Sequence, residues 1–288
     1  MTDRPADPLV DVTWLASHLG APDIRVVDAT WFMPGDPRDA RLLHAEGRIP
    51  GAVFFDIDEI ADTTSSLPHM LPSPEKFASR MRKLGIGDGA RIVVYDQHGV
   101  FSAARAWWMF RVMGKDDVVV LDGGLPAWTA AGGEIEDGPP MKPSERHFTA
   151  RLRRDLVRDL SDMRAAVANG ATAILDARPP GRFEGREPEP RAGLKSGHMP
   201  GAANVPMSAV LTGDKRMKSR EALAEEVFAA TPIDPRQPPV ATCGSGITAA
   251  LIALALARTG RWDAAVYDGS WAEWGALDDA PIVTGSGT

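Results

Sequence analysis

The chain has 288 residues, of which 44% are hydrophobic and 25% are charged, as in a typical soluble globular protein. Its net charge of −7 at pH 7 repels a polyanion on average, so we expect no nucleic-acid partner. The longest apolar helical stretch, residues 249–257, is far shorter than the roughly 20 residues needed to span a bilayer. The N-terminus MTDRPADPLVDV has no apolar segment of the secretory-signal type. We therefore expect a cytoplasmic protein without a membrane partner.

Short apolar segments that end in Asp alternate with longer helical patterns along the whole chain. The predicted strands include residues 91–96, 117–122, 172–177 and 264–269. The predicted helices include residues 75–85, 102–114, 220–230 and 248–260. Alternation of this kind predicts an α/β fold in which a mainly parallel sheet is flanked by helices.

Three landmarks of the first half recur in the second half in the same order. IRVVDAT (24–30) matches TAILDAR (172–178), EGRIPGAVFFDI (46–57) matches SGHMPGAANVPM (196–207), and VVVLDGGLPAW (118–128) matches AAVYDGSWAEW (264–274). The offsets of 148, 150 and 146 residues have the size of a domain, which indicates two tandem copies of one domain. We predict a first domain over residues 9–135, a polar and proline-rich linker over 136–150, and a second domain over 151–280.

The only cysteine of the sequence is Cys243. A single cysteine cannot form an internal disulfide, which fits a reducing compartment. It also excludes a Cys-x-x-Cys redox pair and a cysteine-rich metal cage. Any sulfur chemistry of this chain therefore depends on this one thiol.

The segment PPVATCGSGITAALIALALARTG (238–260) places Cys243 between a predicted strand and a predicted helix, where ligands bind in open α/β sheets. The thiolate is the nucleophilic form of cysteine, and the positive end of a helix dipole favours it. Gly244 and Gly246 allow a turn that directs several backbone N–H groups at one anion, and we predict Thr248 as the helix N-cap. The pattern predicts that main-chain amides hold a thiolate or persulfide at Cys243; the alternative is a buried structural cysteine.

The first copy has a different residue at the position of the cysteine. When IVVYD is aligned with PVATC, Asp96 stands opposite Cys243. The following loop QHGVFSAAR (97–105) is longer and bulkier and has no thiol. We therefore predict that the first domain is non-catalytic.

Over residues 9–280 the sequence resembles the rhodanese family, specifically its two-domain members. The matching segments are RIPGAVFFDID, WWMFRVMG and LDGGLPAW in the first half, and DARPPGRFEGREPEPR, GHMPGA, CGSGIT and YDGSWAEW in the second. The resemblance implies two rhodanese-like domains and sulfur transfer through a cysteine persulfide. It also implies an active-site loop made of Cys243, Gly244, Ser245, Gly246, Ile247 and Thr248.

Family members that use thiosulfate typically have basic residues in this loop, whereas Gly244 and Ser245 resemble the members that use 3-mercaptopyruvate. The resemblance therefore implies 3-mercaptopyruvate as the sulfur donor. Its carboxylate needs arginine forks, and by family pattern Arg182 and Arg191 bind it. The alternative is that the arginines of segment 176–191 only pair with the glutamates of that segment.

One position departs from the family pattern. In this subtype the loop serine, here Ser245, is proposed to assist proton movement with a histidine and an aspartate from the first half. The histidine position is occupied by Arg48, for which we expect a structural role or an added positive charge. His44 lies four residues earlier and is a candidate replacement if its segment is helical.

The resemblance implies a reaction with two steps. The Cys243 thiolate takes sulfur from 3-mercaptopyruvate and pyruvate leaves, and a thiol acceptor such as thioredoxin then removes the outer sulfur. No metal or organic cofactor is implied. Two alternatives stay open, a thiosulfate sulfurtransferase and a non-catalytic sulfur-carrier or redox-binding module. A cysteine phosphatase is excluded because Ala249 stands where Cys-x5-Arg requires arginine.

Overall fold

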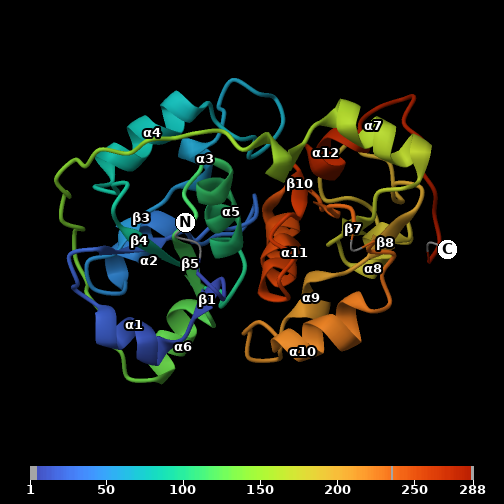
Figure 1. Cartoon of the computed structure of the whole chain (residues 1–288). Helices are drawn as coiled ribbons and strands as arrows, with labels where there is room; N and C mark the ends of the chain where they lie inside the picture. Colours follow the sequence, from blue (N-terminus) through green and yellow to red (C-terminus); the bar gives the residue numbers. More distant parts are fainter. Residues whose placement is uncertain (1–4, 235, 287–288) are drawn as a thin grey trace. The chain divides into compact units, whose positions relative to one another are not determined.

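The structure is a computed structural model that describes residues 5–234 and 236–286. The chain divides into two compact units (Figure 1). Unit 1 comprises the chain up to Thr63 together with Leu71–Arg153 and Gly213–Met217, and unit 2 comprises Thr64–Met70, Arg154–Thr212 and the chain from Lys218. Each unit therefore includes a short segment from the other half of the sequence.

Unit 1 contains a five-stranded sheet with the order β1-β5-β4-β2-β3, in which every neighbouring pair is parallel. The strands are β1 (Leu9–Val10), β2 (Ile24–Asp28), β3 (Val53–Phe54), β4 (Arg91–Tyr95) and β5 (Val118–Leu121). The helices are α1 (Val12–His18), α2 (Ala40–Glu46), α3 (Ile57–Ile60), α4 (Pro74–Lys83), α5 (Ala103–Val112) and α6 (Gly124–Ala130).

Helices cover both faces of this sheet (Figure 1). Alternate residues such as Val93 and Tyr95 of β4 pack in one cluster with Leu15 of α1 and Trp128 of α6. An aromatic cluster brings α4 and α5 together; it consists of Phe55, Phe77, Phe110 and Phe148. Because side chains alternate across a strand, a parallel sheet covered on both faces requires apolar residues on both.

Unit 2 repeats this arrangement with the order β6-β10-β9-β7-β8, again with parallel pairs only. The strands are β6 (Val157–Arg158), β7 (Ile174–Asp176), β8 (Ala202–Asn204), β9 (Val240–Thr242) and β10 (Ala265–Tyr267). The helical segments are η1 (Arg154–Leu156), α7 (Leu160–Asn169), α8 (Pro180–Phe183), α9 (Met207–Val210), α10 (Arg220–Ala222), η2 (Leu223–Phe228), α11 (Ile247–Arg258) and α12 (Ser270–Trp274).

The predicted strands and helices are present, and three predicted helices end at a glycine with left-handed backbone. These are Gly85, Gly114 and Gly260, with φ angles of 66°, 87° and 98°. A residue without a Cβ takes this conformation at little cost. The predicted helix 220–230 differs, because its second part, η2, has π-helical hydrogen bonding. Apolar spacing alone does not distinguish this winding from an α-helix.

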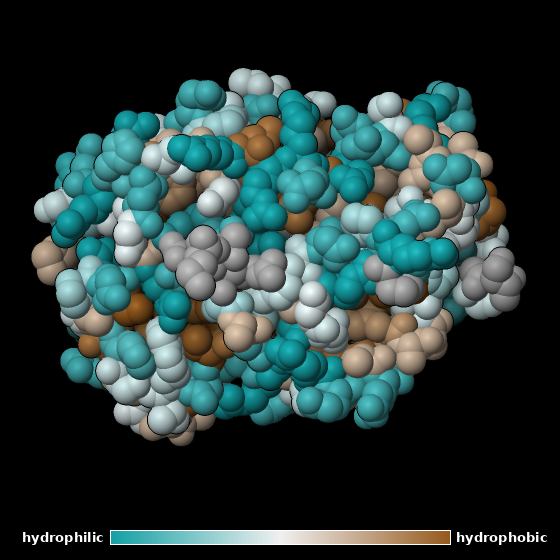
Figure 2. All heavy atoms as spheres, in the orientation of Figure 1, coloured by the Kyte–Doolittle hydropathy of each residue, from teal (hydrophilic) through white to brown (hydrophobic). Residues whose placement is uncertain are grey.

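Hydrophilic residues cover most of the face shown in Figure 2. The exposed large hydrophobic side chains are dispersed along the sequence; they are Met33, Leu42, Ile135, Met141, Leu152 and Val283. Within residues 5–234 and 236–286, no helix is both long and apolar enough to cross a bilayer.

Candidate active site

Cys243 lies directly after β9 and opens the turn that leads into α11. Helix α12 holds this turn, because the Trp271 N–H donates to the Cys243 carbonyl (2.9 Å) and the Ala272 N–H donates to the Gly244 carbonyl (2.9 Å). Strand β10, which precedes α12, is the neighbour of β9 in the sheet. The cysteine turn therefore begins at the carboxyl end of β9 and is hydrogen-bonded to α12, which follows the carboxyl end of β10.

A main-chain donor points at the sulfur. The Gly246 N–H donates to Cys243 Sγ at 3.1 Å. Gly246 has φ 82°, a left-handed angle that suits glycine, and it occupies the N-cap position of α11. A backbone N–H at a helix N-terminus favours negative charge on the sulfur that it contacts. This turn has the local geometry of a site for a thiolate.

The prediction that Thr248 caps the helix is wrong. The left-handed backbone at Gly246 places the N-cap two residues earlier than predicted, so α11 begins at Ile247 and Thr248 lies in its first turn. Cys243 is 2% exposed and Ser245 is 7% exposed, whereas Gly244 and Thr248 are half-buried. The cysteine is therefore more deeply buried than the Gly244 that follows it.

Both arginines that the family pattern indicates lie beside the loop. A Cβ placed on Gly244 would be 3.1 Å from Arg182 Nη2 and 3.9 Å from Arg191 Nη1. Two guanidinium groups thus approach the residue that follows the cysteine. Guanidinium groups bind carboxylates through paired N–H donors, so a carboxylate next to this loop would find suitable donors.

These arginines belong to a network that we call the arginine–carboxylate cluster, made of Asp176, Arg178, Arg182, Glu189 and Arg191. Arg178 donates to Asp176 (2.7 Å) and to Glu189 (2.8 Å), and Arg182 pairs with the same Glu189. Burial by itself would lower the pKa of Arg178, but the carboxylates of Asp176 and Glu189 outweigh it and raise that pKa. Arg191 forms no hydrogen bond or ion pair with the residues that the structure describes.

The alternative role of these arginines is realised in part. Arg186 is exposed and pairs with Glu184, so it belongs to the charged surface of the segment. Arg182 pairs with Glu189 while its Nη2 also approaches Gly244. Ion pairing within the segment and proximity to the loop are therefore compatible for Arg182.

Sequence reasoning did not single out Ser270. The Ser270 hydroxyl accepts from the Cys243 N–H (3.3 Å), and Ser270 has a left-handed φ of 50° although it is not glycine. The repeat contains a signal for this, since Ser270 aligns with Gly124, which has φ 55°. Trp271, which follows, is buried and carries the Arg178 guanidinium 4.0 Å above its ring. A non-glycine residue held in this backbone region often marks a functional site.

Unit 1 contains the structural counterpart of the cysteine turn. The Leu125 N–H donates to the Asp96 carbonyl (3.0 Å), as Trp271 does to Cys243, which confirms the alignment of Asp96 with the cysteine. The buried Asp96 carboxylate accepts from the N–H groups of His98, Phe101 and Ala103, each at 2.8 Å. At the position equivalent to the cysteine, these three main-chain amides are therefore already hydrogen-bonded to a carboxylate of the chain itself.

The residues around the missing family histidine have a structural role. Arg48 is buried; it pairs with Glu136 and donates to the Gly138 carbonyl at 2.7 Å. A hydrogen bond from the Gly51 N–H lowers the pKa of Glu136, burial opposes this shift, and Arg48 adds to it. Of the two roles expected for Arg48, the structure supports the structural one.

His44 meets the helical condition for a replacement, because it lies in α2. Its Nδ1 is bound to the Asp28 carboxylate at 2.8 Å, and both side chains are buried. Its Nε2 is buried and has no hydrogen-bond partner in residues 5–234 and 236–286. Within the described residues, the His44 ring is therefore hydrogen-bonded to Asp28 alone.

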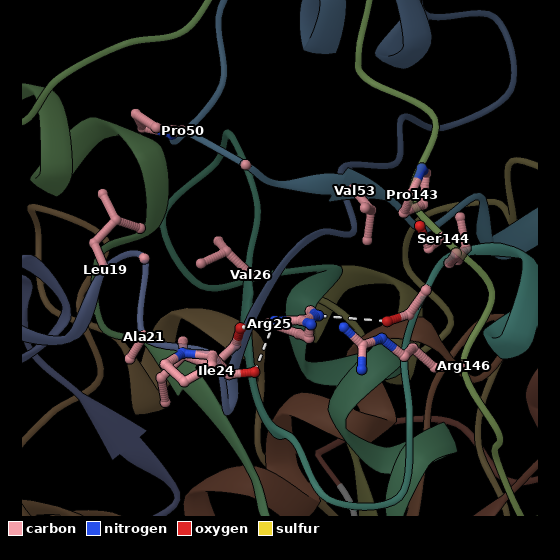
Figure 3. Close-up of a pocket in the computed structure, with 15 residues that line it drawn as sticks. Leu19, Ala21, Ile24, Arg25, Val26, Pro50, Val53, Pro143, Ser144 and Arg146 are labelled. Atoms are coloured by element: carbon pink, nitrogen blue, oxygen red, sulfur yellow. Dashed lines mark hydrogen bonds between the residues drawn. The ribbon is translucent and has the colours of Figure 1, made fainter.

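A separate cavity of about 320 Å³ lies in unit 1 (Figure 3). It is lined by residues at or just before the amino ends of β2 and β3, by Leu84 and Gly85 ahead of β4, and by Pro143, Ser144 and Arg146 of the predicted linker. Figure 3 shows Arg25 and Arg146 in its wall, and Arg25 donates to the carbonyls of Ile24 (2.7 Å) and Gly85 (3.4 Å). This cavity has no thiol and lies at the amino ends of the strands, whereas Asp96 follows the carboxyl end of β4. It is not the counterpart of the cysteine turn.

A model of the rhodanese-like domain matches residues 11–131 and 159–277. The chain belongs to the rhodanese family. The predicted family resemblance is thereby confirmed, and so is the predicted fold of two rhodanese-like α/β domains.

Several members of this family are similar to almost the entire chain. The 3-mercaptopyruvate sulfurtransferase of Escherichia coli K12 is 41% identical over 274 residues, which cover 95% of this chain and 96% of that protein. The 3-mercaptopyruvate sulfurtransferase of Homo sapiens is 40% identical, with 92% and 91% covered. The thiosulfate sulfurtransferase of Gallus gallus is 42% identical, with 92% of each chain covered.

Solved structures of the family agree with this assignment. The crystal structure of SseA from Escherichia coli, described as a rhodanese fold of 3-mercaptopyruvate sulfotransferases, superposes with a TM-score of 0.83. It is 38% identical, and the match covers 93% of this chain and all of that chain.

Proposed function

We propose that the chain is a 3-mercaptopyruvate sulfurtransferase, which moves sulfane sulfur through a Cys243 persulfide to a thiol acceptor and releases pyruvate. The observation that carries this proposal is that Arg182 and Arg191 lie beside Gly244, next to a cysteine whose sulfur accepts a main-chain N–H. A thiolate and two carboxylate-binding groups are the functions that this donor requires. Family members with this activity in their names share about 40% of their residues with the chain.

The first step begins with the donor carboxylate bound by Arg182 and Arg191. The Cys243 thiolate attacks the donor sulfur, the bond between that sulfur and carbon breaks, and pyruvate leaves as its enolate. The enolate then takes a proton, for which we propose Ser245 as the assisting hydroxyl. The Gly246 N–H stabilises the thiolate before the step and the persulfide after it, because it contacts Sγ directly.

The second step returns the cysteine to its starting state. A thiolate of the acceptor attacks the outer sulfur, and Cys243 leaves as a thiolate. We propose a small thiol or a reduced thioredoxin as the acceptor. This sequence predicts ping-pong kinetics, since pyruvate leaves before the acceptor reacts.

We further propose that the first domain, residues 9–135, does not catalyse the reaction and that residues 151–280 form the catalytic domain. The support is Asp96, whose carboxylate takes up the amides at the position of the cysteine. We propose the cytoplasm as the location, because a single thiol that must stay reduced fits a reducing compartment. Fractionation of cells that express the tagged chain tests this location.

The deciding experiment compares wild type with Cys243→Ser. Wild type should release pyruvate from 3-mercaptopyruvate and, without acceptor, gain the mass of one sulfur atom. Cys243→Ser should do neither. If the serine variant still transfers sulfur, or if wild type gains no sulfur, the proposed persulfide mechanism is wrong. The latter outcome would favour a non-catalytic binding module.

A thiosulfate sulfurtransferase is the second candidate, and the similarity to the Gallus gallus enzyme favours it. Thiosulfate carries two negative charges, whereas 3-mercaptopyruvate carries one carboxylate. Measuring kcat/KM for both donors with one preparation and one acceptor distinguishes the two. A clear preference for thiosulfate would replace our assignment.

A further inference from the structure

Glu189 is bound to Arg182, one of the two arginines that approach the cysteine loop. Its side chain is 1% exposed. It accepts from Arg178 Nη1 at 2.8 Å and from Arg182 Nε at 3.1 Å, and it also accepts from Arg182 Nη2. Charge-assisted hydrogen bonds from two guanidinium groups hold this buried carboxylate in a fixed position.

The ion pairs of the arginine–carboxylate cluster are unequally distributed. Arg178 has its own partner in Asp176, whose two oxygens lie 2.7–3.1 Å from the Arg178 nitrogens. Glu189 is therefore the carboxylate that offsets the charge of Arg182. Arg191 has no ion-pair partner in the described part of the chain. Three guanidinium groups against two carboxylates leave the cluster with one net positive charge.

We infer that Glu189 determines donor specificity: it limits the charge of the donor site so that a monoanionic donor is favoured over a dianionic one. This inference rests on the proposed function, in which Arg182 and Arg191 bind the donor. The Glu189 carboxylate is bound to Nε and Nη2 of the Arg182 guanidinium, so it repels each negative charge of a donor bound by that guanidinium. The second charge of thiosulfate meets this repulsion again, whereas 3-mercaptopyruvate has no second charge.

The test is Glu189→Gln, which keeps the shape of the side chain and one acceptor oxygen but removes the charge. The quantity to measure is kcat/KM for thiosulfate divided by kcat/KM for 3-mercaptopyruvate, with cyanide as the common acceptor. For charges about 6–8 Å apart at an effective dielectric constant of about 20, we expect the ratio to rise by about 10- to 100-fold. The rise should be smaller at high salt, because ions screen part of the interaction.

A purely structural role of Glu189 would lower kcat/KM for both donors together and leave their ratio unchanged. The matched control is Glu184→Gln, which alters a glutamate of the same segment that pairs with the exposed Arg186. We expect the control to have the wild-type ratio. A rise of the same size in the control would overturn the inference, and so would an unchanged or lower ratio in folded Glu189→Gln.

Arg191→Gln gives an independent reading if Glu189→Gln does not fold, because Arg191 is partly exposed and bound to no neighbour in the described ranges. Removing its charge should lower the same ratio by about tenfold, for the same Coulombic reason. A ratio that stays at the wild-type value would overturn the inference. If wild type turns over neither donor and gains no sulfur, the proposed function itself fails. If wild type is active but the substitutions leave the ratio of kcat/KM for the two donors unchanged, only the role of Glu189 is refuted.

Discussion

Gly244→Ala adds a single methyl group at the point where the cysteine loop meets Arg182 and Arg191, the arginines proposed to bind the donor. The new Cβ would lie 3.1 Å from Arg182 Nη2, a few tenths of an ångström closer than an ordinary contact. The backbone at Gly244 is not left-handed, so alanine adds no strain there. Arg182 cannot shift freely, because Glu189 binds its Nε and Nη2. We therefore expect the guanidinium to shift and to lose about one charge-assisted hydrogen bond to the donor, worth about 1.5–3 kcal/mol.

This loss corresponds to a fall of about 10- to 100-fold in kcat/KM for 3-mercaptopyruvate. Most of it should appear as a higher KM, because the methyl group affects binding more than the sulfur itself. The assay couples pyruvate release to lactate dehydrogenase, and thermal unfolding is followed in parallel. Gly89→Ala is the control, since a Cβ there would have open space. An unchanged KM in a Gly244→Ala variant that melts like wild type would refute the placement of Arg182 at the donor site.

Three further outcomes concern stability. Arg178→Met leaves the buried carboxylates of Asp176 and Glu189 without their shared partner, and we expect it to lower the free energy of unfolding in urea by about 3–5 kcal/mol; a loss below about 1 kcal/mol would contradict the cluster. Asp96→Asn removes the charge bound by three amides and should cost about 1.5–3 kcal/mol in the same assay, whereas a stability equal to wild type would argue against the bound anion. The pKa of Glu136 is below its ordinary value of 4.5, so its stabilisation is complete above pH 4.5 and is lost as the pH falls through its folded-state pKa. The difference in unfolding free energy between wild type and Glu136→Gln should therefore shrink on acidification, and a constant difference would exclude this linkage.

The sequence by itself determined the architecture and was enough to propose Cys243 as the nucleophile. Apolar segments ending in Asp and helices ending in Gly are local signals, because φ restrictions and side-chain periodicity act within a few residues. Because the two halves of the sequence repeat, the residue at each position of one half can be compared with its counterpart in the other half. This comparison singled out Cys243 against Asp96, and the backbone of the two turns agrees with that alignment.

Only the tertiary structure decided which charges act together. Asp176 and Glu189 are 13 positions apart, yet both bind Arg178, and no periodicity indicates that pairing. The same holds for Arg48, whose buried guanidinium is balanced by Glu136 from a segment that was predicted only as a linker. Ion pairing depends on distance and burial in space rather than on spacing along the chain. The sequence therefore indicated which arginines could bind a donor. Only the folded structure showed which carboxylates offset the charge of these arginines.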